Sequence, residues 1–161
     1  MPALRIGIVT SSDSCAAGEK ADGSGPALVA LAEQRGWQIA GYRLCADDRS
    51  ALTAAIADLA DVESADVVFT TGGTGFSPRD VAPEATLDAC DRMAPGIAEH
   101  IRAESVKVTP RAMLSRGVAG LRGRTLVINV PGSVKAARES FGFVADQLEH
   151  AVEMMAGGGH D

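Results

Sequence analysis

Apolar residues along this chain fall into short runs, separated by longer segments in which apolar residues recur every three or four positions. A short apolar run is typical of a strand covered on both faces in a parallel sheet. Recurrence at three and four positions is typical of a helix that buries one face. The pattern predicts strands at residues 4–10, 37–45, 66–71 and 125–130. It predicts helices at residues 26–36, after residue 48, from residue 83 and near residues 97–105. A last helix is predicted from residue 134 to the glycines at 157–159.

Strands and helices alternate along the sequence, and this order decides the predicted fold. Strands joined by helices form a mainly parallel sheet with right-handed crossovers and with helices on both faces. We therefore predict a three-layer α/β/α sandwich, built as a single domain over residues 1–161. Ligands of such sheets bind beside the carboxyl ends of the strands. Four polar or glycine-rich segments are predicted at that edge: residues 11–25, 46–48, 72–80 and 131–135.

Composition and charge exclude several classes of protein. The chain has 161 residues and a formal net charge of −6, and only 4% of its residues are aromatic. An acidic chain with few aromatic side chains is not expected to bind nucleic acid or an anionic membrane surface. Its three cysteines form no C-x-x-C pair, and no apolar span is long enough for a membrane helix. We therefore expect a soluble cytoplasmic protein with reduced thiols.

Positive charge is concentrated in one part of the chain. Residues 102–138 contain eight lysine and arginine side chains and one acid, Glu104, although the whole chain is acidic. Two interpretations remain open: a local site for an anion, or a helix and turn surface that happens to be basic.

The loop after the predicted strand at 66–71 is the strongest candidate for a phosphate site. It reads Thr71-Gly72-Gly73-Thr74-Gly75. Glycines have no Cβ, so consecutive backbone N–H groups can turn toward one anion, and a helix begins shortly afterwards. The loop is not a Walker A motif, and it lacks the third glycine of a dinucleotide fingerprint. A tight connection between strand and helix is the alternative interpretation.

Two aspartates follow strand ends at the same predicted edge. Asp47 comes after the strand at 37–45, and Asp80 ends the glycine-rich loop. Carboxylates beside phosphate groups point to Mg²⁺, which takes one or two protein carboxylates together with phosphate oxygens and water. The pair predicts a magnesium site, although each aspartate alone is more typical of a helix cap or a turn.

A second candidate anion site is the turn Pro131-Gly132-Ser133, which joins the strand at 125–130 to the last helix. Asn129 stands at the end of that strand, and Lys135 stands in the first turn of the helix. A cation at a helix start opposes the helix dipole, so Lys135 is either there for an anionic partner or is a solvated surface residue. Ser115 is a further candidate polar contact, or an ordinary loop serine.

Several motifs together resemble one family over nearly the whole chain. They are Asp22-Gly23-Ser24-Gly25-Pro26, the glycine-rich loop followed by Pro78-Arg79-Asp80 and Pro83-Glu84-Ala85-Thr86, Met113-Leu114-Ser115-Arg116, and Asn129-Val130-Pro131-Gly132-Ser133. The chain resembles the molybdopterin-binding domain of molybdenum cofactor biosynthesis, and within it the molybdopterin adenylyltransferases. The resemblance implies the fold of that domain.

The resemblance also implies an activity, the transfer of AMP from Mg-ATP to the terminal phosphate of molybdopterin with release of pyrophosphate. By motif position, Asp47 and Asp80 would be the catalytic carboxylates linked to Mg²⁺, and ATP would be the co-substrate. The family commonly forms homotrimers, and a separate molybdenum insertase would receive the product. The implied substrate-binding residues are Asp22, Ser24, Thr71, Gly72, Gly73, Thr74, Gly75, Glu84, Ser115, Asn129, Pro131, Gly132, Ser133 and Lys135.

Two positions complicate the resemblance. Ala82 stands where the family usually places threonine before Pro-Glu-Ala-Thr, which removes an expected N-cap contributing ~1 kcal/mol. Asp47 lies in a short motif beside Asp48, so Asp48 is an alternative functional carboxylate.

Fold alone does not decide function, so a non-catalytic module that carries molybdopterin for another protein remains an alternative. Such a carrier would need the glycine turns but not both carboxylates. A module of nucleotide-salvage proteins is less favoured, because those proteins are normally longer and contain another domain.

Overall fold

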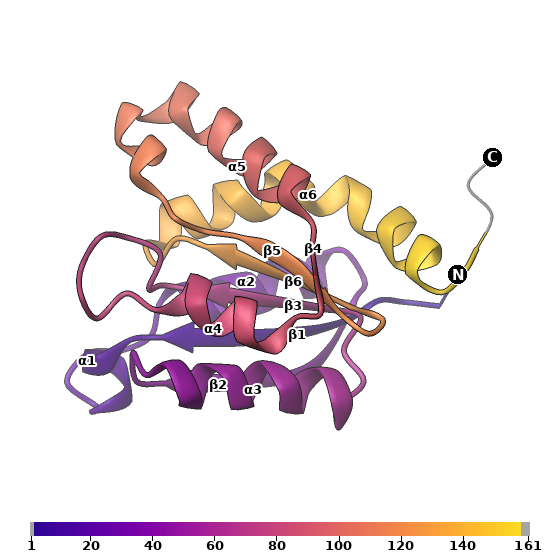
Figure 1. Cartoon of the computed structure of the whole chain (residues 1–161), viewed down its shortest axis with the longest axis horizontal. Helices are drawn as coiled ribbons and strands as arrows, with labels where there is room; N and C mark the ends of the chain where they lie inside the picture. The colour runs from indigo at the N-terminus through magenta and orange to yellow at the C-terminus, as the bar shows by residue number, and fades with distance from the viewer. Residues whose placement is uncertain (1, 159–161) are drawn as a thin grey trace.

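The computed structural model of this chain describes residues 2–158, which form one six-stranded sheet with helices on both sides (Figure 1). The strands are β1 (Arg5–Ser11), β2 (Gln38–Cys45), β3 (Val67–Thr71), β4 (Arg92–Met93), β5 (Ala119–Arg122) and β6 (Thr125–Val130). The helices are α1 (Asp13–Ala16), α2 (Ser24–Gln34), α3 (Arg49–Asp61), α4 (Ala82–Ala89), α5 (Pro95–Val108), the 3-10 helix η1 (Pro110–Leu114) and α6 (Val134–Met155). Within residues 2–158, no helix has the length and apolar character needed to cross a membrane.

The sheet has the strand order β2-β1-β3-β6-β5-β4. The strands β2, β1, β3 and β6 are parallel, whereas β5 runs antiparallel to β6 and β4 runs antiparallel to β5. Thr10, Thr71 and Val130 stand in register near the ends of β1, β3 and β6. The loops after these strands therefore leave from one edge of the sheet, on the side where Figure 1 shows α1.

Each central strand contributes to two apolar cores, because successive side chains of a strand point to opposite faces. Phe69 of β3 lies in the core beneath α2, α5 and α6, where its ring packs against Phe141 with centroids 5.2 Å apart. Val68, the residue before it, lies in the second core beneath α3 and α4. The predicted three-layer α/β/α sandwich is confirmed.

The start of α6 and the ends of α2 and α6 lie at the serine and glycine residues that the sequence predicts for them. The Ser133 hydroxyl accepts a hydrogen bond from the Ala136 N–H at 3.1 Å and caps α6. Gly36 follows α2 with φ of +80°, the left-handed conformation that favours glycine after a helix. Gly157 follows α6 in the same way, with φ of +85°. The last glycine of that predicted stop, residue 159, lies outside the described residues.

The expectation of a missing cap at Ala82 is wrong. The cap position of α4 is Val81, whose side chain forms no capping hydrogen bond. Ala82 lies inside the first turn of the helix and is buried, with its Cβ close to the glycine loop. A small apolar side chain at this position therefore packs beneath the loop instead of capping the helix.

The sequence pattern does not reveal β4, β5, α1 or η1. Both strands are too short to show alternation. Position 120 of β5 requires glycine, because a Cβ there would lie 2.9 Å from Cys90. The single turn α1 lies within residues 11–25, which are polar enough to predict a loop. The predicted helix near 97–105 begins earlier, at Pro95, since proline fits the first turn of a helix.

Candidate active site

Two glycine turns lie side by side at the carboxyl edge of the sheet. Gly72 and Gly73 follow β3 with φ of +94° and +71°, values that side chains other than glycine rarely adopt. A Cβ on Gly72 would collide with the carbonyl oxygen of Ser11. A Cβ on Gly132 in the second turn would lie 3.1 Å from the Gly72 Cα. Glycine is therefore required at Gly72 both by its backbone conformation and by the approach of a neighbouring strand.

The two turns separate two cavities. The first, which we call the β1-side cavity, has a volume of about 480 Å³ and is lined by Thr10, Ser11, Ser12, Cys15, residues 20–24, Thr71, Gly72, Gly132, Ser133 and Val134. The second, the α5-side cavity, has a volume of about 300 Å³ and is lined by Thr74, Gly75, Ser115, Gly117, Asn129, Pro131, Ala136, Glu139 and residues of α5, η1 and the segment between them. Consecutive residues of the same two turns thus face different cavities.

Asp22 fixes one wall of the β1-side cavity. Its carboxylate accepts hydrogen bonds from the Thr10 hydroxyl at 2.7 Å, the Gly25 N–H at 3.2 Å and the Tyr42 hydroxyl. Burial and the hydrogen bond to Asp22 raise the pKa of Tyr42 to about 12. Three donors occupy Asp22, so this residue orders the turn into α2. Ser24 is buried as the first residue of that helix.

Asn129 and Ser115 lie at the α5-side cavity. Asn129 is buried, and its Nδ2 donates hydrogen bonds to the hydroxyls of Thr70 and Thr86, both at 2.8 Å. Its Oδ1 accepts a hydrogen bond from the Val118 N–H at 3.1 Å. The amide therefore links β6, β3, α4 and the loop before β5, and it gives the cavity a fixed polar floor.

Arg116 holds the glycine loop in place. Its guanidinium donates hydrogen bonds to the carbonyl oxygens of Gly75 and Asp80, both at 2.8 Å, and forms an ion pair with Glu84 at 2.7 Å. This ion pair lowers the pKa of Glu84. The Glu84 carboxylate is thus engaged by the Arg116 guanidinium, which it orients toward the glycine loop.

Asp47 and Asp48 have different surroundings. Asp48 caps α3, where its Oδ2 accepts a hydrogen bond from the Ala51 N–H at 2.8 Å. Asp47 accepts hydrogen bonds from the Ser11 hydroxyl at 2.6 Å and from the Asp13 N–H at 3.0 Å. Since Ser11 lines the β1-side cavity, these contacts place Asp47 beside it and favour Asp47 over Asp48 as the functional carboxylate.

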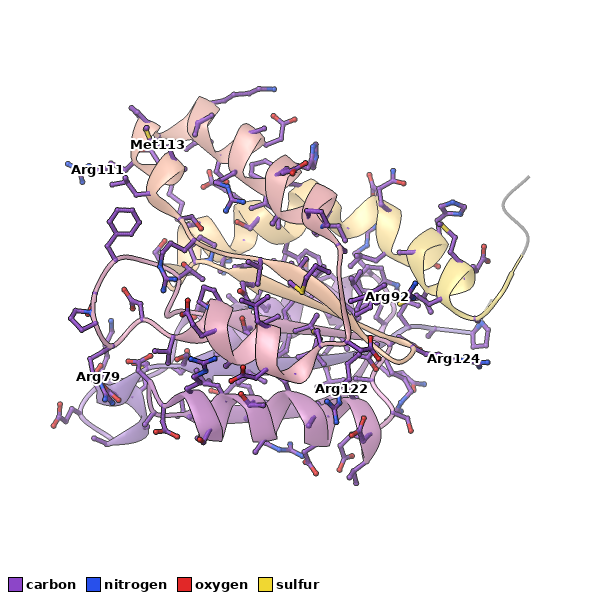
Figure 2. All side chains as sticks on the ribbon, viewed as in Figure 1. Arg79, Arg92, Arg111, Met113, Arg122 and Arg124 are labelled. Atoms are coloured by element: carbon purple, nitrogen blue, oxygen red, sulfur yellow. The ribbon has the colours of Figure 1, made fainter. Side chains whose placement is uncertain are left out.

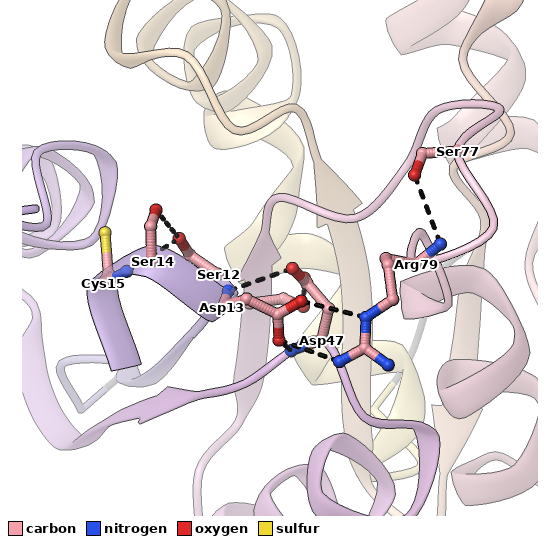
Figure 3. Close-up of polar contacts among 8 residues, drawn as sticks. Ser12, Asp13, Ser14, Cys15, Asp47, Ser77 and Arg79 are labelled. Carbon is pink, nitrogen blue, oxygen red and sulfur yellow. Dashed lines mark hydrogen bonds and ion pairs between the residues drawn. The ribbon is translucent and has the colours of Figure 1, made fainter. Parts of the chain in front are cut away.

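Asp13 links Asp47 to the loop that carries Asp80 (Figure 3). Arg79 donates one hydrogen bond to each carboxylate oxygen of Asp13, both at 2.9 Å, and thereby lowers the pKa of Asp13. Asp13 also accepts a hydrogen bond from the Asp47 N–H at 2.9 Å. Asp80 accepts a hydrogen bond from the Ser77 N–H at 3.0 Å. Asp47 and the residue next to Asp80 therefore contact the same side chain.

Lys135 lines neither cavity. Its ammonium group forms an ion pair with Glu139 at 3.1 Å, one turn along α6, and its side chain is 73% exposed. This position favours the solvated surface interpretation of Lys135.

Comparison with known proteins shows to which family this chain belongs. A family profile described as a probable molybdopterin binding domain matches residues 7–150. The chain belongs to the molybdopterin-binding domain family. It is similar to the molybdopterin biosynthesis enzyme MoaB from Thermus thermophilus, with 43% identity and a TM-score of 0.89 over 96% of this chain and 97% of that one. The molybdopterin adenylyltransferase of Helicobacter pylori strain J99 is 35% identical over 159 residues, which cover 98% of this chain and 90% of that protein.

Two further relatives are much longer than this chain. The molybdenum cofactor synthesis protein cinnamon of Drosophila melanogaster is 38% identical over 157 residues, which are 96% of this chain but 26% of that protein. Gephyrin of Dictyostelium discoideum is 37% identical over 160 residues, which are 22% of its length. The chain thus spans about a quarter of these two relatives.

The resemblance to the molybdopterin adenylyltransferases implies a bound Mg²⁺. The residues present could hold this ion only if a substrate supplied further ligands. Among residues 2–158, no group of three or more His, Cys, Asp or Glu side chains gathers to hold a metal ion. Asp13 is paired with Arg79, which leaves Asp47 and Asp80. Within the described part of the chain, only one oxygen of the Asp80 carboxylate accepts a hydrogen bond. Two carboxylates suffice for Mg²⁺ when phosphate oxygens and water complete its coordination.

Three residues organise this site although the sequence assigns them no role there. Arg116 belongs to the basic segment 102–138, and so does Arg102, which donates to the carbonyl oxygens of Ser115 and Gly117, both at 3.0 Å. Part of that basic segment therefore holds loops of this molybdopterin-binding domain by their backbone. Asp13 lies in a polar segment, and in the sequence only the presence of a carboxylate there indicates a function.

Proposed function

We propose that this chain is a molybdopterin adenylyltransferase, which transfers AMP from ATP to the terminal phosphate of molybdopterin and releases pyrophosphate. The observation that carries this proposal is the pair of glycine turns lying between two cavities, with Asp47 beside one of them. Such a transferase binds two substrates at once and brings their phosphates to one point. Two cavities divided by phosphate-binding turns suit that task.

The chemistry requires no nucleophilic side chain. An oxygen of the molybdopterin phosphate attacks the α-phosphorus of ATP, and the bond to pyrophosphate breaks with its electrons leaving on pyrophosphate. The attacking phosphate is already anionic, so no protein base is needed. Such transfers depend on positioning and on neutralising charge. In this chain the backbone N–H groups of residues 73–75 would bind phosphate oxygens, since the Gly72 N–H already donates to the Val130 carbonyl oxygen at 3.2 Å. Arg116 would keep that loop in place.

Asp47 and Asp80 would hold Mg²⁺. When bound, the ion neutralises phosphate charge and orients the triphosphate. Asp47 is prepared for this task because the Ser11 hydroxyl and the Asp13 N–H fix its carboxylate. Asp80 is fixed at one oxygen by the Ser77 N–H, which leaves the other for a ligand.

We also propose the oligomeric state of the enzyme, its compartment and the protein that receives its product. Residues 1–161 would act as one domain, as a homotrimer in the cytoplasm, and would pass the adenylylated pterin to a separate molybdenum insertase. The free cysteines Cys15, Cys45 and Cys90 fit a reducing compartment. Analytical ultracentrifugation tests the trimer.

The test of the function is an incubation of the purified protein with molybdopterin, ATP and Mg²⁺, scored for pyrophosphate. We expect pyrophosphate only when both substrates are present. Binding of molybdopterin with no pyrophosphate in the complete mixture would support the carrier module instead.

A further inference from the structure

Asp13 makes contacts that neither its position as the first residue of the short helix α1 nor its half-buried surroundings require. Its carboxylate accepts three hydrogen bonds, two from the Arg79 guanidinium and one from the Asp47 N–H. Its own N–H donates to the Asp47 carboxylate at 3.0 Å. Asp13 and Asp47 therefore hold each other through reciprocal bonds between the backbone of one and the side chain of the other (Figure 3). Both the backbone and the carboxylate of Asp47 are fixed by this exchange.

The segment before Asp80 contacts the same Asp13 side chain through Arg79. Phe76 is 70% exposed, and residues 76–79 all lie at the surface. Within the described residues, the Arg79 guanidinium is the side chain of this segment that reaches another part of the chain, and its partner is Asp13. Figure 2 shows Arg79 beside the first short helix. A guanidinium that meets a carboxylate through two parallel hydrogen bonds has a defined orientation as well as a defined distance.

We propose that Asp13 is a positioning residue that sets the placement of Asp47 relative to Asp80 by binding Asp47 directly and Asp80 through Arg79. The inference rests on the proposed adenylyl transfer, in which these two carboxylates act together. Asp13 acts through Asp47 and Arg79, because its carboxylate oxygens accept hydrogen bonds from both residues. The loop after β1 thereby joins the loops after β2 and β3 into one unit.

Because the Asp13–Arg79 ion pair is exposed, an effect of its removal on the position of Asp47 can be distinguished from an effect on folding. The side chains of Arg79 and Asp13 are 63% and 45% exposed, and exposed pairs contribute little to global stability. Variants of either residue are therefore expected to fold. Displacement of a catalytic group by ~1 Å can reduce a rate ~100-fold. The effect of removing Asp13 should accordingly appear in kcat and not in the free energy of unfolding.

The experiment compares Asp13→Ala, Arg79→Ala and the double variant in steady-state AMP transfer. We expect each single variant to lower kcat ~10- to 100-fold with a small change in KM for ATP, and the double variant to be no slower than the slower single variant, because the two side chains act as one unit. The matched control is Asp61→Ala, which removes another two-bond pair, with Arg122 at 2.7 Å, at the far end of α3. Unchanged kcat in Asp13→Ala, or losses that multiply in the double variant, would overturn the proposal.

A second readout does not depend on catalysis. Amide hydrogen exchange should accelerate at Asp47 in Asp13→Ala and at residues 77–80 in both single variants, while Asp61→Ala leaves both segments unchanged. Absence of AMP transfer in the wild-type protein would remove the proposed function but leave this measurement informative. Unchanged exchange at Asp47 and at residues 77–80 in Asp13→Ala would contradict the positioning role by itself.

Discussion

Asp80 differs from the other carboxylates around the glycine turns in what its oxygens contact. Glu84 is paired with Arg116, Asp13 is paired with Arg79, and Asp22 accepts three hydrogen bonds. Asp80 accepts a single hydrogen bond from the described residues, through one oxygen. A carboxylate with an open oxygen at the edge of the proposed phosphate-binding loop is suited to hold a cation.

The variant Asp80→Asn tests this difference. A neutral amide is a poor ligand for Mg²⁺, so we expect kcat for AMP transfer to fall ~100- to 1000-fold. Binding of molybdopterin, measured by fluorescence titration, should stay near the wild-type value because no contact to the pterin is removed. Turnover equal to that of the wild type would remove Asp80 from the catalytic site.

Glu84 gives the stability of this fold a dependence on pH. Arg116 lowers the pKa of Glu84 in the folded chain. A carboxylate with a lowered pKa adds stability that is complete above its unfolded value, 4.5, and is lost as the pH falls through its folded value. The free energy of unfolding of the wild type should therefore decrease below pH 4.5, and that of Glu84→Gln should decrease less steeply.

Urea denaturation on both sides of pH 4.5 measures this slope. Glu19→Gln is a suitable control, because Glu19 forms no ion pair among residues 2–158 and should keep the slope of the wild type. An equally steep loss in Glu84→Gln would show that this ion pair does not contribute.

At the scale of the elements, the start of α3 separates two adjacent aspartates. Asp48 caps the helix, and Asp47 faces the loop after β1. We expect Asp48→Ala to lower the free energy of unfolding by ~1 kcal/mol, as the loss of an N-cap does, while AMP transfer continues. Thermal unfolding and a turnover assay on the same sample check both parts. Loss of turnover with unchanged stability would transfer the catalytic role from Asp47 to Asp48.

The elements that the sequence predicts are those whose apolar pattern is long enough to be read. The buried runs of β3 and β6 predict central strands, and the stripe of α6 predicts a long helix. The strands β4 and β5 have two and four residues, which are too few for a pattern. Their pairing beside β6 depends on contacts that only the folded chain makes.

At the scale of the whole molecule, the two cavities lie on either side of one pair of glycine turns. We expect Ala21→Trp, at the β1-side cavity, and Ala112→Trp, at the α5-side cavity, to raise KM for different substrates. Each bulky side chain would fill only the cavity beside it. Steady-state kinetics with ATP and molybdopterin varied in turn measure this. A rise in KM for the same substrate in both variants would contradict the use of separate cavities.

The composition of the candidate site could be predicted only in part. Glycine turns at strand ends, and the aspartates next to them, are local features that the order of strands brings to one edge. The bonds between Arg79 and Asp13 join positions 66 residues apart, and those between Arg116 and Glu84 join positions 32 apart. Such pairs follow no local spacing, so they emerge only when the loops are folded against each other.

The most direct test of the central claim follows the α-phosphate of ATP. The protein is incubated with molybdopterin, Mg²⁺ and ATP labelled at the α-phosphate, and the pterin is then isolated. Adenylyl transfer predicts that the label appears in the pterin product in an amount equal to the pyrophosphate released. Label that stays in ATP or free AMP while molybdopterin is bound would contradict the account.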